Sequence, residues 1–242
     1  MLNCLTDPDS AVRWPAAEAL RTWKGARLVD PMIAALRDAE PQVRSRAADA
    51  LWRLGDRRAV EHLIAALDDT DDTVRENAIG ALGWLDDRRA VQPVIAQLGH
   101  PNSEVRFAAA YALRNLGDAA AVDALVGALR DEDALVRLFA ASALGRLRDR
   151  RAAEPLVGAL GDAHSSVRAA ACLALGQLHD PRTFDALVGC LADEYDEVRL
   201  WAARGLGWLG DRRAIEALIR VQNDEFAEVR AAVREALVEL GP

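Results

Sequence analysis

The 242-residue sequence is poor in cysteine, histidine and aromatic residues, and it has no long hydrophobic run. Its three cysteines form neither a metal-binding spacing nor an even disulfide set, so we expect a reducing, cytoplasmic compartment. No apolar run is long enough to predict a membrane span, which needs about 18 residues. The first residues, MLNCLTDPDS, have neither the basic nor the apolar region of a signal peptide.

An excess of basic charge and the usual catalytic motifs are also absent. The chain has 38 acidic and 30 basic residues and a net charge of −8, which disfavours a nucleic-acid partner because such proteins need a basic footprint. The sequence has no P-loop, no GxGxxG and no GxSxG motif, and none of its four histidines is followed by glutamate. We therefore expect no catalytic residues, no metal and no cofactor, and a non-enzymatic role is favoured.

What the sequence does contain is a repeat of 31 residues. The dipeptide Val-Arg occurs eight times, and every interval between successive copies is 31 residues. The copies begin at residues 12, 43, 74, 105, 136, 167, 198 and 229. A period that is held without gaps along the chain predicts one structural unit stacked on itself.

Each unit reads as two helices. A segment that starts with Val-Arg, such as VRLFAASALGRL at 136–147, has apolar or small residues at positions 0, 4, 7, 8 and 11 counted from the valine. At 100° per residue these positions form one buried stripe, and we call this segment helix B. The segment before it, such as AVEHLIAAL at 59–67, has apolar residues at i, i+3, i+4 and i+7 and is called helix A.

The connectors carry capping signals. Gly55 and Gly210 fit left-handed caps at the end of helix B, and Asp71 and Asp133 fit the start of the next helix B. Two short helices cannot bury their apolar faces alone, so the units must stack. The prediction is an all-α solenoid of about eight two-helix units. We expect residues 1–242 to form one solenoid whose first unit is incomplete, because MLNCL at 1–5 aligns with the second half of a helix A.

The repeat also carries a motif, Asp-x5-Arg followed by Ala-Ala-x-Ala-Leu-Gly and Gly-Asp-x-Arg-Ala-Val. It stands here as DTDDTVRENAIGALGWL at 69–85 and LGDRRAVEHLIAAL at 54–67. With this motif the chain resembles HEAT-like repeats, in particular the 31-residue phycobilin-lyase type. The resemblance implies that the Asp and Arg form a ladder between neighbouring units and that helix B lines an inner, concave surface. The family includes scaffolds, bilin-lyase subunits and artificial binding-protein libraries.

Aromatic residues gather on one side of helix B. Positions 2, 3, 6, 9 and 10, which we call the outer face, lie opposite the buried stripe. They hold eight of the twelve aromatic residues: Trp14, Trp52, Trp84, Phe107, Tyr111, Phe139, Trp201 and Trp208. They also hold several arginines, and no acidic residue occurs on this face from Asn77 to Trp208. Glycines at position 9 are expected to leave shallow spaces there, whereas Trp23 falls on the buried stripe.

Aromatic side chains beside arginines are typical of protein interfaces. We therefore predict a scaffold that binds a protein or peptide partner on this concave face. The predicted partner-binding residues are Trp52, Trp84, Phe107, Tyr111, Arg114, Phe139, Arg146, Trp201, Arg204 and Trp208.

Other interpretations stay open. The outer-face aromatics can instead pack between adjacent B helices. The family resemblance implies a chromophore-binding subunit of the bilin-lyase type, in which arginines pair with propionates. The paired arginines of the connectors, such as Arg57 and Arg58, can form an anion-binding rim or simply pair with nearby aspartates. Cys172 and Cys190 are predicted to be small buried residues.

Overall fold

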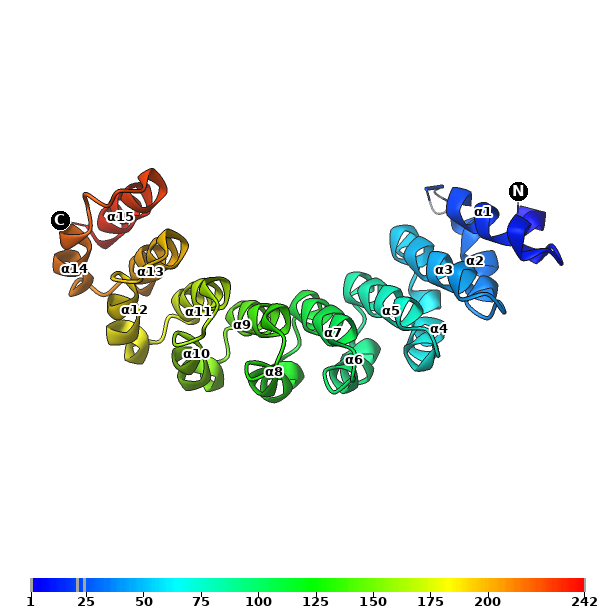
Figure 1. Ribbon diagram of the computed structural model, residues 1–242, viewed down its shortest axis with the longest axis horizontal. Coiled ribbons are helices and arrows are strands. Elements are labelled where there is room, and N and C mark those ends of the chain that lie inside the picture. The colour runs from blue at the N-terminus through cyan, green and yellow to red at the C-terminus, as the bar shows by residue number, and fades with distance from the viewer. Residues whose placement is uncertain (1, 21, 24, 242) are drawn as a thin grey trace. The chain divides into compact units, whose positions relative to one another are not determined.

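The computed structural model describes residues 2–20, 22–23 and 25–241, and within these ranges it contains α-helices and short 3-10 helices but no strands (Figure 1). The all-α prediction is confirmed. The chain divides into two compact units, Met1–Ala121 and Val122–Pro242. Within each unit the B helices lie side by side in one row and the A helices in a second row. No helix of the described ranges is long and apolar enough to cross a bilayer.

The B helices coincide with the Val-Arg copies. In the first unit they are α1 (Ser10–Leu20), α3 (Pro41–Leu54), α5 (Asp72–Leu85) and α7 (Ser103–Leu116). In the second unit they are α9 (Ala134–Leu147), α11 (Ser165–Leu178), α13 (Asp196–Leu209) and α15 (Ala227–Leu240). The valine that opens each pattern is buried in every copy from Val43 onward, as the buried stripe requires.

The A helices are shorter and most begin with a 3-10 turn. They are η1 (Leu2–Thr6), α2 (Val29–Ala35), α4 (Val60–Ala65), α6 (Val91–Gln97), α8 (Val122–Ala128), α10 (Ala153–Ala159), α12 (Phe184–Cys190) and α14 (Ala214–Arg220). The adjoining 3-10 turns are η2 (Ala26–Leu28), η3 (Arg57–Ala59), η4 (Ala66–Asp68), η5 (Arg88–Ala90), η6 (Ala119–Ala121), η7 (Arg150–Ala152) and η8 (Pro181–Thr183). The periodicity predicted the helices, but it did not predict these tighter turns.

The predicted caps are present. Gly55 and Gly210 adopt left-handed conformations, with φ of 66° and 73°, at the ends of α3 and α13. The Asp71 side chain accepts hydrogen bonds from the backbone N–H groups of Thr73 and Val74, and Asp133 caps α9 in the same way. These contacts satisfy N–H groups that have no partner inside the helix.

The prediction for Trp23 is wrong, because its side chain is 53% exposed. The helical-wheel prediction requires the first helix B to continue through position 11, which is Trp23, but α1 ends at Leu20. Trp23 therefore lies beyond the helix and outside its buried stripe.

The prediction of shallow spaces at position 9 is also wrong. A Cβ atom on Gly83 would lie 2.8 Å from the Cα of Ala112, and one on Gly176 would lie 2.5 Å from the Cα of Gly205. Gly145 and Gly207 meet the next B helix in the same way. These glycines are the points where neighbouring B helices cross most closely, so backbone of the next helix fills the space that the missing side chain leaves.

A ladder of ion pairs joins successive repeats. The Arg168 guanidinium donates from Nε and Nη2 to the two carboxylate oxygens of Asp193, at 2.8 and 2.9 Å, and from Nη1 to the carbonyl of Asp162 at 2.9 Å. The same arrangement joins Arg13 to Asp38, Arg44 to Asp69, Arg137 to Asp162, and Arg199 to Asp224. Each arginine thus bridges its own loop and the next repeat, which confirms the structural ladder.

The ladder changes where His100 replaces the aspartate. Arg75 pairs instead with Asp72, which lies in its own helix α5. Asp72 also accepts a hydrogen bond from Asn102 Nδ2 at 2.7 Å, and His100 Nε2 lies 3.8 Å from it. A local cluster therefore replaces the bidentate pair at this step.

Candidate functional site

The first unit brings together two tryptophans of the outer face. Trp52 of α3 and Trp84 of α5 are stacked, with ring centroids 5.9 Å apart and an interplanar angle of 28°. The indole of Trp52 donates to Asp49 at 2.7 Å, and the Arg53 guanidinium lies 4.7 Å from its ring centroid. Trp52 is therefore held by three neighbours. Trp84 is 56% exposed and leaves much of its ring open to a ligand.

The remaining predicted residues of this unit lie on the next helix, α7. Phe107 and Tyr111 are half-buried and tilted against each other, with centroids 6.5 Å apart. Arg114 is half-buried on the same helix. Because α3, α5 and α7 pack side by side, these side chains and the tryptophan pair belong to one surface.

The second unit holds a comparable cluster on α13. The rings of Trp201 and Trp208 are 6.4 Å apart, and the Arg204 guanidinium lies 5.2 Å from the Trp201 ring centroid. Arg204 also contacts Glu235 of α15 at 3.5 Å. Trp201 thus contacts the other two residues predicted from α13, and the charge of Arg204 is partly balanced by a partner on the neighbouring helix.

The other predicted residues of the second unit lie on α9. Phe139 is half-buried and Arg146 is exposed. Within the part of the chain that the structure describes, Arg146 has no hydrogen bond or ion pair. Helix α11 lies between α9 and α13 and contributes Leu173 and Gln177 to the outer face.

Burial separates the predicted aromatic residues into two kinds. Trp84 is exposed, whereas Trp52, Phe107, Tyr111, Phe139, Trp201 and Trp208 are half-buried. The binding-surface interpretation and the packing interpretation therefore each describe part of this face. Most of the rings pack against neighbouring side chains and also keep an exposed edge. Such partly exposed aromatics bury further area when a partner covers them.

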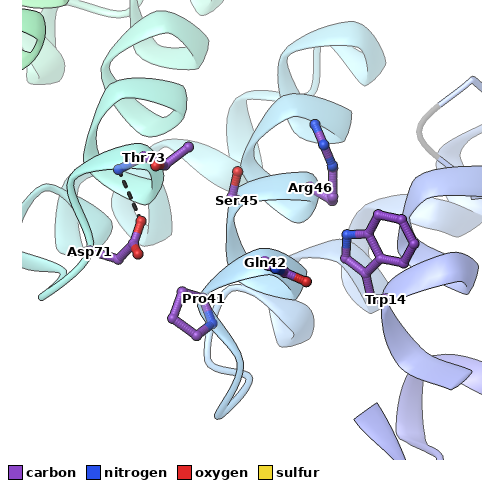
Figure 2. A pocket seen from close by; sticks show the side chains of 7 residues that line it. All are labelled: Trp14, Pro41, Gln42, Ser45, Arg46, Asp71 and Thr73. Carbon is purple, nitrogen blue, oxygen red and sulfur yellow. Dashed lines mark hydrogen bonds between the residues drawn. The ribbon is translucent and has the colours of Figure 1, made fainter. Parts of the chain in front are cut away.

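A pocket that the sequence did not predict lies at the start of the B helices in the first unit. It has a volume of about 320 Å³ and is lined by Trp14, Pro41, Gln42, Ser45, Arg46, Asp71 and Thr73 (Figure 2). Trp14 and Gln42 lie on one side, and Asp71 caps Thr73 on the other. Arg46 is paired with Glu18 at 2.9 Å. The only sequence signal was the presence of Trp14 and Arg46 on the outer face.

In three connectors the second arginine of the pair forms a second structural ladder. Arg89 binds Asp87 of its own connector at 2.8 Å and Glu61 of the preceding helix A at 2.7 Å. Hydrogen bonds from the Arg89 side chain and backbone lower the pKa of Asp87 to about 2. Arg58 and Arg151 are paired in the same way. These guanidinium groups are engaged with carboxylates, which supports the structural interpretation for the second arginine of each pair, whereas the first arginines, Arg57, Arg88 and Arg150, are exposed.

The two predicted buried cysteines differ. Cys172 is fully buried, whereas Cys190 is only half-buried, so the prediction for Cys190 is wrong. Cys190 is the last residue of α12, where the short helix A ends near the surface. A hydrogen bond with Cys190, together with burial, raises the pKa of Cys172.

Comparison with known proteins identifies the class of repeat. The sequence profile of HEAT repeats matches residues 1–79, 60–137, 127–200 and 190–242. The chain therefore belongs to the HEAT-repeat family. No curated protein sequence matches it.

Several solved structures are similar. The complex of CpcE and CpcF of phycocyanin lyase from Nostoc sp. is 27% identical, with a TM-score of 0.58 over 88% of this chain and 94% of that one. An engineered protein is 23% identical, with a TM-score of 0.67 over 100% and 77%. YibA from Escherichia coli is 22% identical, with a TM-score of 0.70 over 97% and 90%. The last two likenesses show the fold alone.

Proposed function

We propose that this HEAT-repeat protein is a non-enzymatic scaffold that binds a protein or peptide partner through the outer face of its B helices. The observation that carries this proposal is the one-sided placement of partly exposed aromatic residues on an otherwise acidic protein. Trp84 is the most exposed of them at 56%, and the Trp52–Trp84 and Trp201–Trp208 pairs each present a combined aromatic surface. Aromatic anchors with adjacent arginines are the usual hot spots of protein interfaces.

One of the similar solved structures supports a protein partner. The phycocyanin lyase structure is a complex of CpcE and CpcF, and the likeness covers 88% of this protein and 94% of the one chain that it matches. Within each unit the row of B helices offers a surface that suits the capture of a helix or an extended segment.

A capture experiment with a matched control tests the proposal. The immobilised protein, a Trp84→Ala, Trp201→Ala, Trp208→Ala variant and a Trp23→Ala variant are exposed to lysate of the source cells, and bound proteins are identified by mass spectrometry. Trp23 is 53% exposed but lies outside the B helices, so its loss controls for non-specific binding to an exposed indole.

We expect one partner that binds the wild-type protein and the Trp23 variant and is lost from the triple variant. The purified partner must then bind the wild-type protein and the Trp23 variant with similar affinity, and the triple variant more weakly. The helical circular dichroism signal of all variants should be unchanged, since none of the substituted residues is fully buried. Equal capture of the partner by the triple variant contradicts the proposal.

The second candidate function is chromophore binding, and the 27% identity to the phycocyanin lyase complex favours it. The stacked rings of Trp52 and Trp84 would then hold a tetrapyrrole, and Arg114 of the same unit would pair with a propionate. Titration with a free bilin tests this role. A shift of the visible absorbance that saturates at micromolar protein supports it, and an unchanged spectrum contradicts it.

A further inference from the structure

We propose that Trp84, Arg114 and Asn115 form a subsite for an acidic peptide segment. In this site a partner carboxylate pairs with Arg114, an adjacent apolar side chain covers Trp84, and the partner backbone hydrogen-bonds to Asn115. The inference rests on the proposed scaffold function and specifies the chemistry of the partner in the first unit.

The three residues lie where α5 and α7 cross. A Cβ atom on Gly83 would lie 2.8 Å from the Cα of Ala112, so the two helices touch at this point. Trp84 directly follows Gly83, and Arg114 and Asn115 come within one helical turn after Ala112. The indole, the guanidinium and the amide therefore belong to the same end of one helix pair.

Trp84 supplies an apolar platform. One side of its ring system stacks on Trp52, with centroids 5.9 Å apart, yet 56% of the residue is exposed. Stacking fixes the indole without covering it. A prepositioned aromatic ring loses little freedom when a partner side chain packs on it, which is the usual property of an anchor residue.

Arg114 supplies an available charge. Within the described part of the chain it makes no hydrogen bond or ion pair. The two outer-face arginines of α3 have acidic neighbours: Arg46 binds Glu18 at 2.9 Å, and Arg53 lies 3.6 Å from Asp49. A half-buried guanidinium without such a neighbour can pair with a ligand carboxylate without first breaking an internal ion pair.

Asn115 supplies an adaptable polar group. Its Nδ2 is enclosed and has no hydrogen-bond partner in the described structure. By contrast, Nδ2 of Asn77 on α5 donates to Ser45 Oγ at 2.8 Å and to the Thr73 carbonyl at 2.9 Å. Enclosed donors without partners are uncommon in folded proteins and call for a reason. Because this amide has no bond to lose, it can turn about χ2 and present either its N–H or its carbonyl to a peptide backbone.

The surrounding charge favours an acidic partner over a basic one. No acidic residue occupies the outer face of α5 after Asn77 or any outer-face position of α7. Two acids of the adjoining connectors are engaged, since Asp87 binds Arg89 and Asp118 accepts a hydrogen bond from the Ala120 N–H at 2.9 Å, whereas the Asp86 side chain is exposed. A partner lysine would face the unpaired Arg114, whereas a glutamate or aspartate would neutralise it.

Selection from a display library of random 12-residue peptides tests the subsite. The wild-type protein is the target, and selected peptides are synthesised with a fluorescent label for anisotropy titrations. We expect an aspartate or glutamate beside a leucine, isoleucine, phenylalanine or tryptophan in these peptides. Trp84→Ala and Arg114→Gln should each weaken binding about tenfold or more, as expected for hot-spot residues. A glutamine in place of the peptide carboxylate should remove the effect of Arg114→Gln.

Two asparagine variants distinguish a binding role of Asn115 from a structural one, because peptide affinity and melting temperature are measured on both. Asn115→Leu should weaken peptide binding without lowering the melting temperature, because it removes a donor that has no partner. Asn77→Leu is the matched control and should lower the melting temperature, because its donor is engaged. A lower melting temperature for Asn115→Leu with unchanged peptide affinity would overturn the role of Asn115.

The outcomes separate this inference from the proposed function. Basic peptides, or acidic peptides whose affinity is unchanged by Trp84→Ala and Arg114→Gln, overturn the subsite. If the peptides that do not depend on Trp84 and Arg114 lose their binding to a Trp201→Ala, Trp208→Ala variant, the scaffold function stands and only the subsite fails. If no peptide prefers the wild-type protein over the triple tryptophan variant, both fail.

Discussion

At the scale of single residues, glycines of the same helix have opposite roles. In α5, a Cβ atom on Gly83 would lie 2.8 Å from the backbone of Ala112, whereas one on Gly80 would meet nothing within 4 Å. The first glycine permits close contact between two B helices. The second only adds backbone freedom to the unfolded chain and weakens the helix.

Two alanine substitutions should therefore change stability in opposite directions. Gly83→Ala forces α5 and α7 apart and should lower the free energy of unfolding by about 1–3 kcal/mol, as overpacking does. Gly80→Ala should raise it by about 0.5–1 kcal/mol, because alanine is the better helix former. Urea denaturation followed by circular dichroism measures both. Two variants of equal stability would show that the crossing at Gly83 is not tight.

The two cysteines of the second unit should also differ in reactivity. Cys172 is fully buried, and both its hydrogen bond with Cys190 and its burial raise its pKa, so it should hold almost no thiolate. Cys190 is half-buried, and the hydrogen bond with Cys172 lowers its pKa. Because the thiolate is the reactive form, iodoacetamide at neutral pH should modify Cys190 and spare Cys172. Peptide mapping checks this, and equal labelling in the folded protein would contradict it.

At the scale of helices, the C-terminal caps are of two kinds. Gly55, Gly117 and Gly210 have the positive φ that ends their B helices, but Asp86, Arg148 and His179 adopt the same conformation without being glycine. A side chain in this region clashes with its own backbone, which costs about 1 kcal/mol. The helices α5, α9 and α11 therefore end in mildly strained residues.

Arg148→Gly should relieve this strain and raise the free energy of unfolding by about 1 kcal/mol. Arg148 has φ of 53° and no hydrogen bond or ion pair from its side chain in the described structure. The comparison is Gly210→Ala at the equivalent position of α13, which should be destabilising. Thermal unfolding of the two variants measures the difference. A lower melting temperature for Arg148→Gly would mean that its side chain has a stabilising contact.

The sequence predicts the helices well because each one follows from its own local pattern. Val198, Ala202 and Leu206 are buried as the periodicity requires, and Asp71 and Asp133 cap their helices. The contacts between helices are less predictable. A helical wheel places Gly83 on the outer face, but it contains no information on where the next B helix crosses.

The same limit applies to the candidate site. Periodicity predicted that Trp52 and Trp84, or Trp201 and Trp208, share a face, and these rings are indeed in contact. It could not predict that Arg204 lies beside Glu235 of the next repeat, while Arg114 makes no ion pair with any residue that the structure describes. Partners that are one repeat away depend on the geometry of stacking, which one helix does not determine.

At the scale of the whole molecule, stability is divided among contacts between neighbouring repeats. The arginine–aspartate ladder has two such steps in the first unit, at Arg13–Asp38 and Arg44–Asp69. It has three in the second, at Arg137–Asp162, Arg168–Asp193 and Arg199–Asp224. The side chains of these pairs are mostly shielded from solvent, so losing the charge of one partner leaves the other without compensation.

This ladder should make the protein sensitive to acid. The hydrogen bond from Arg168 lowers the pKa of Asp193 below its ordinary value, and Arg199 does the same for Asp224. A carboxyl whose pKa is lower in the folded state stabilises fully above its unfolded pKa of about 3.9. That stabilisation is lost as the pH falls through the folded pKa. The melting temperature should therefore change little from pH 7 to about pH 5 and fall steeply below about pH 4.

The Asp193→Asn, Asp224→Asn variant separates the contribution of the ladder to the acid sensitivity from that of the other acidic residues. Each substitution should cost about 2–3 kcal/mol at pH 7, the usual contribution of a hydrogen bond between charged groups. Because the wild-type protein loses the same stabilisation on protonation, the two melting curves should converge as the pH falls toward 3. Glu216→Gln, which changes an exposed acid of α14, should instead follow the wild-type protein at every pH. A gap between variant and wild type that is the same at pH 7 and pH 3 would mean that the two aspartates stabilise the repeats by shape rather than by charge.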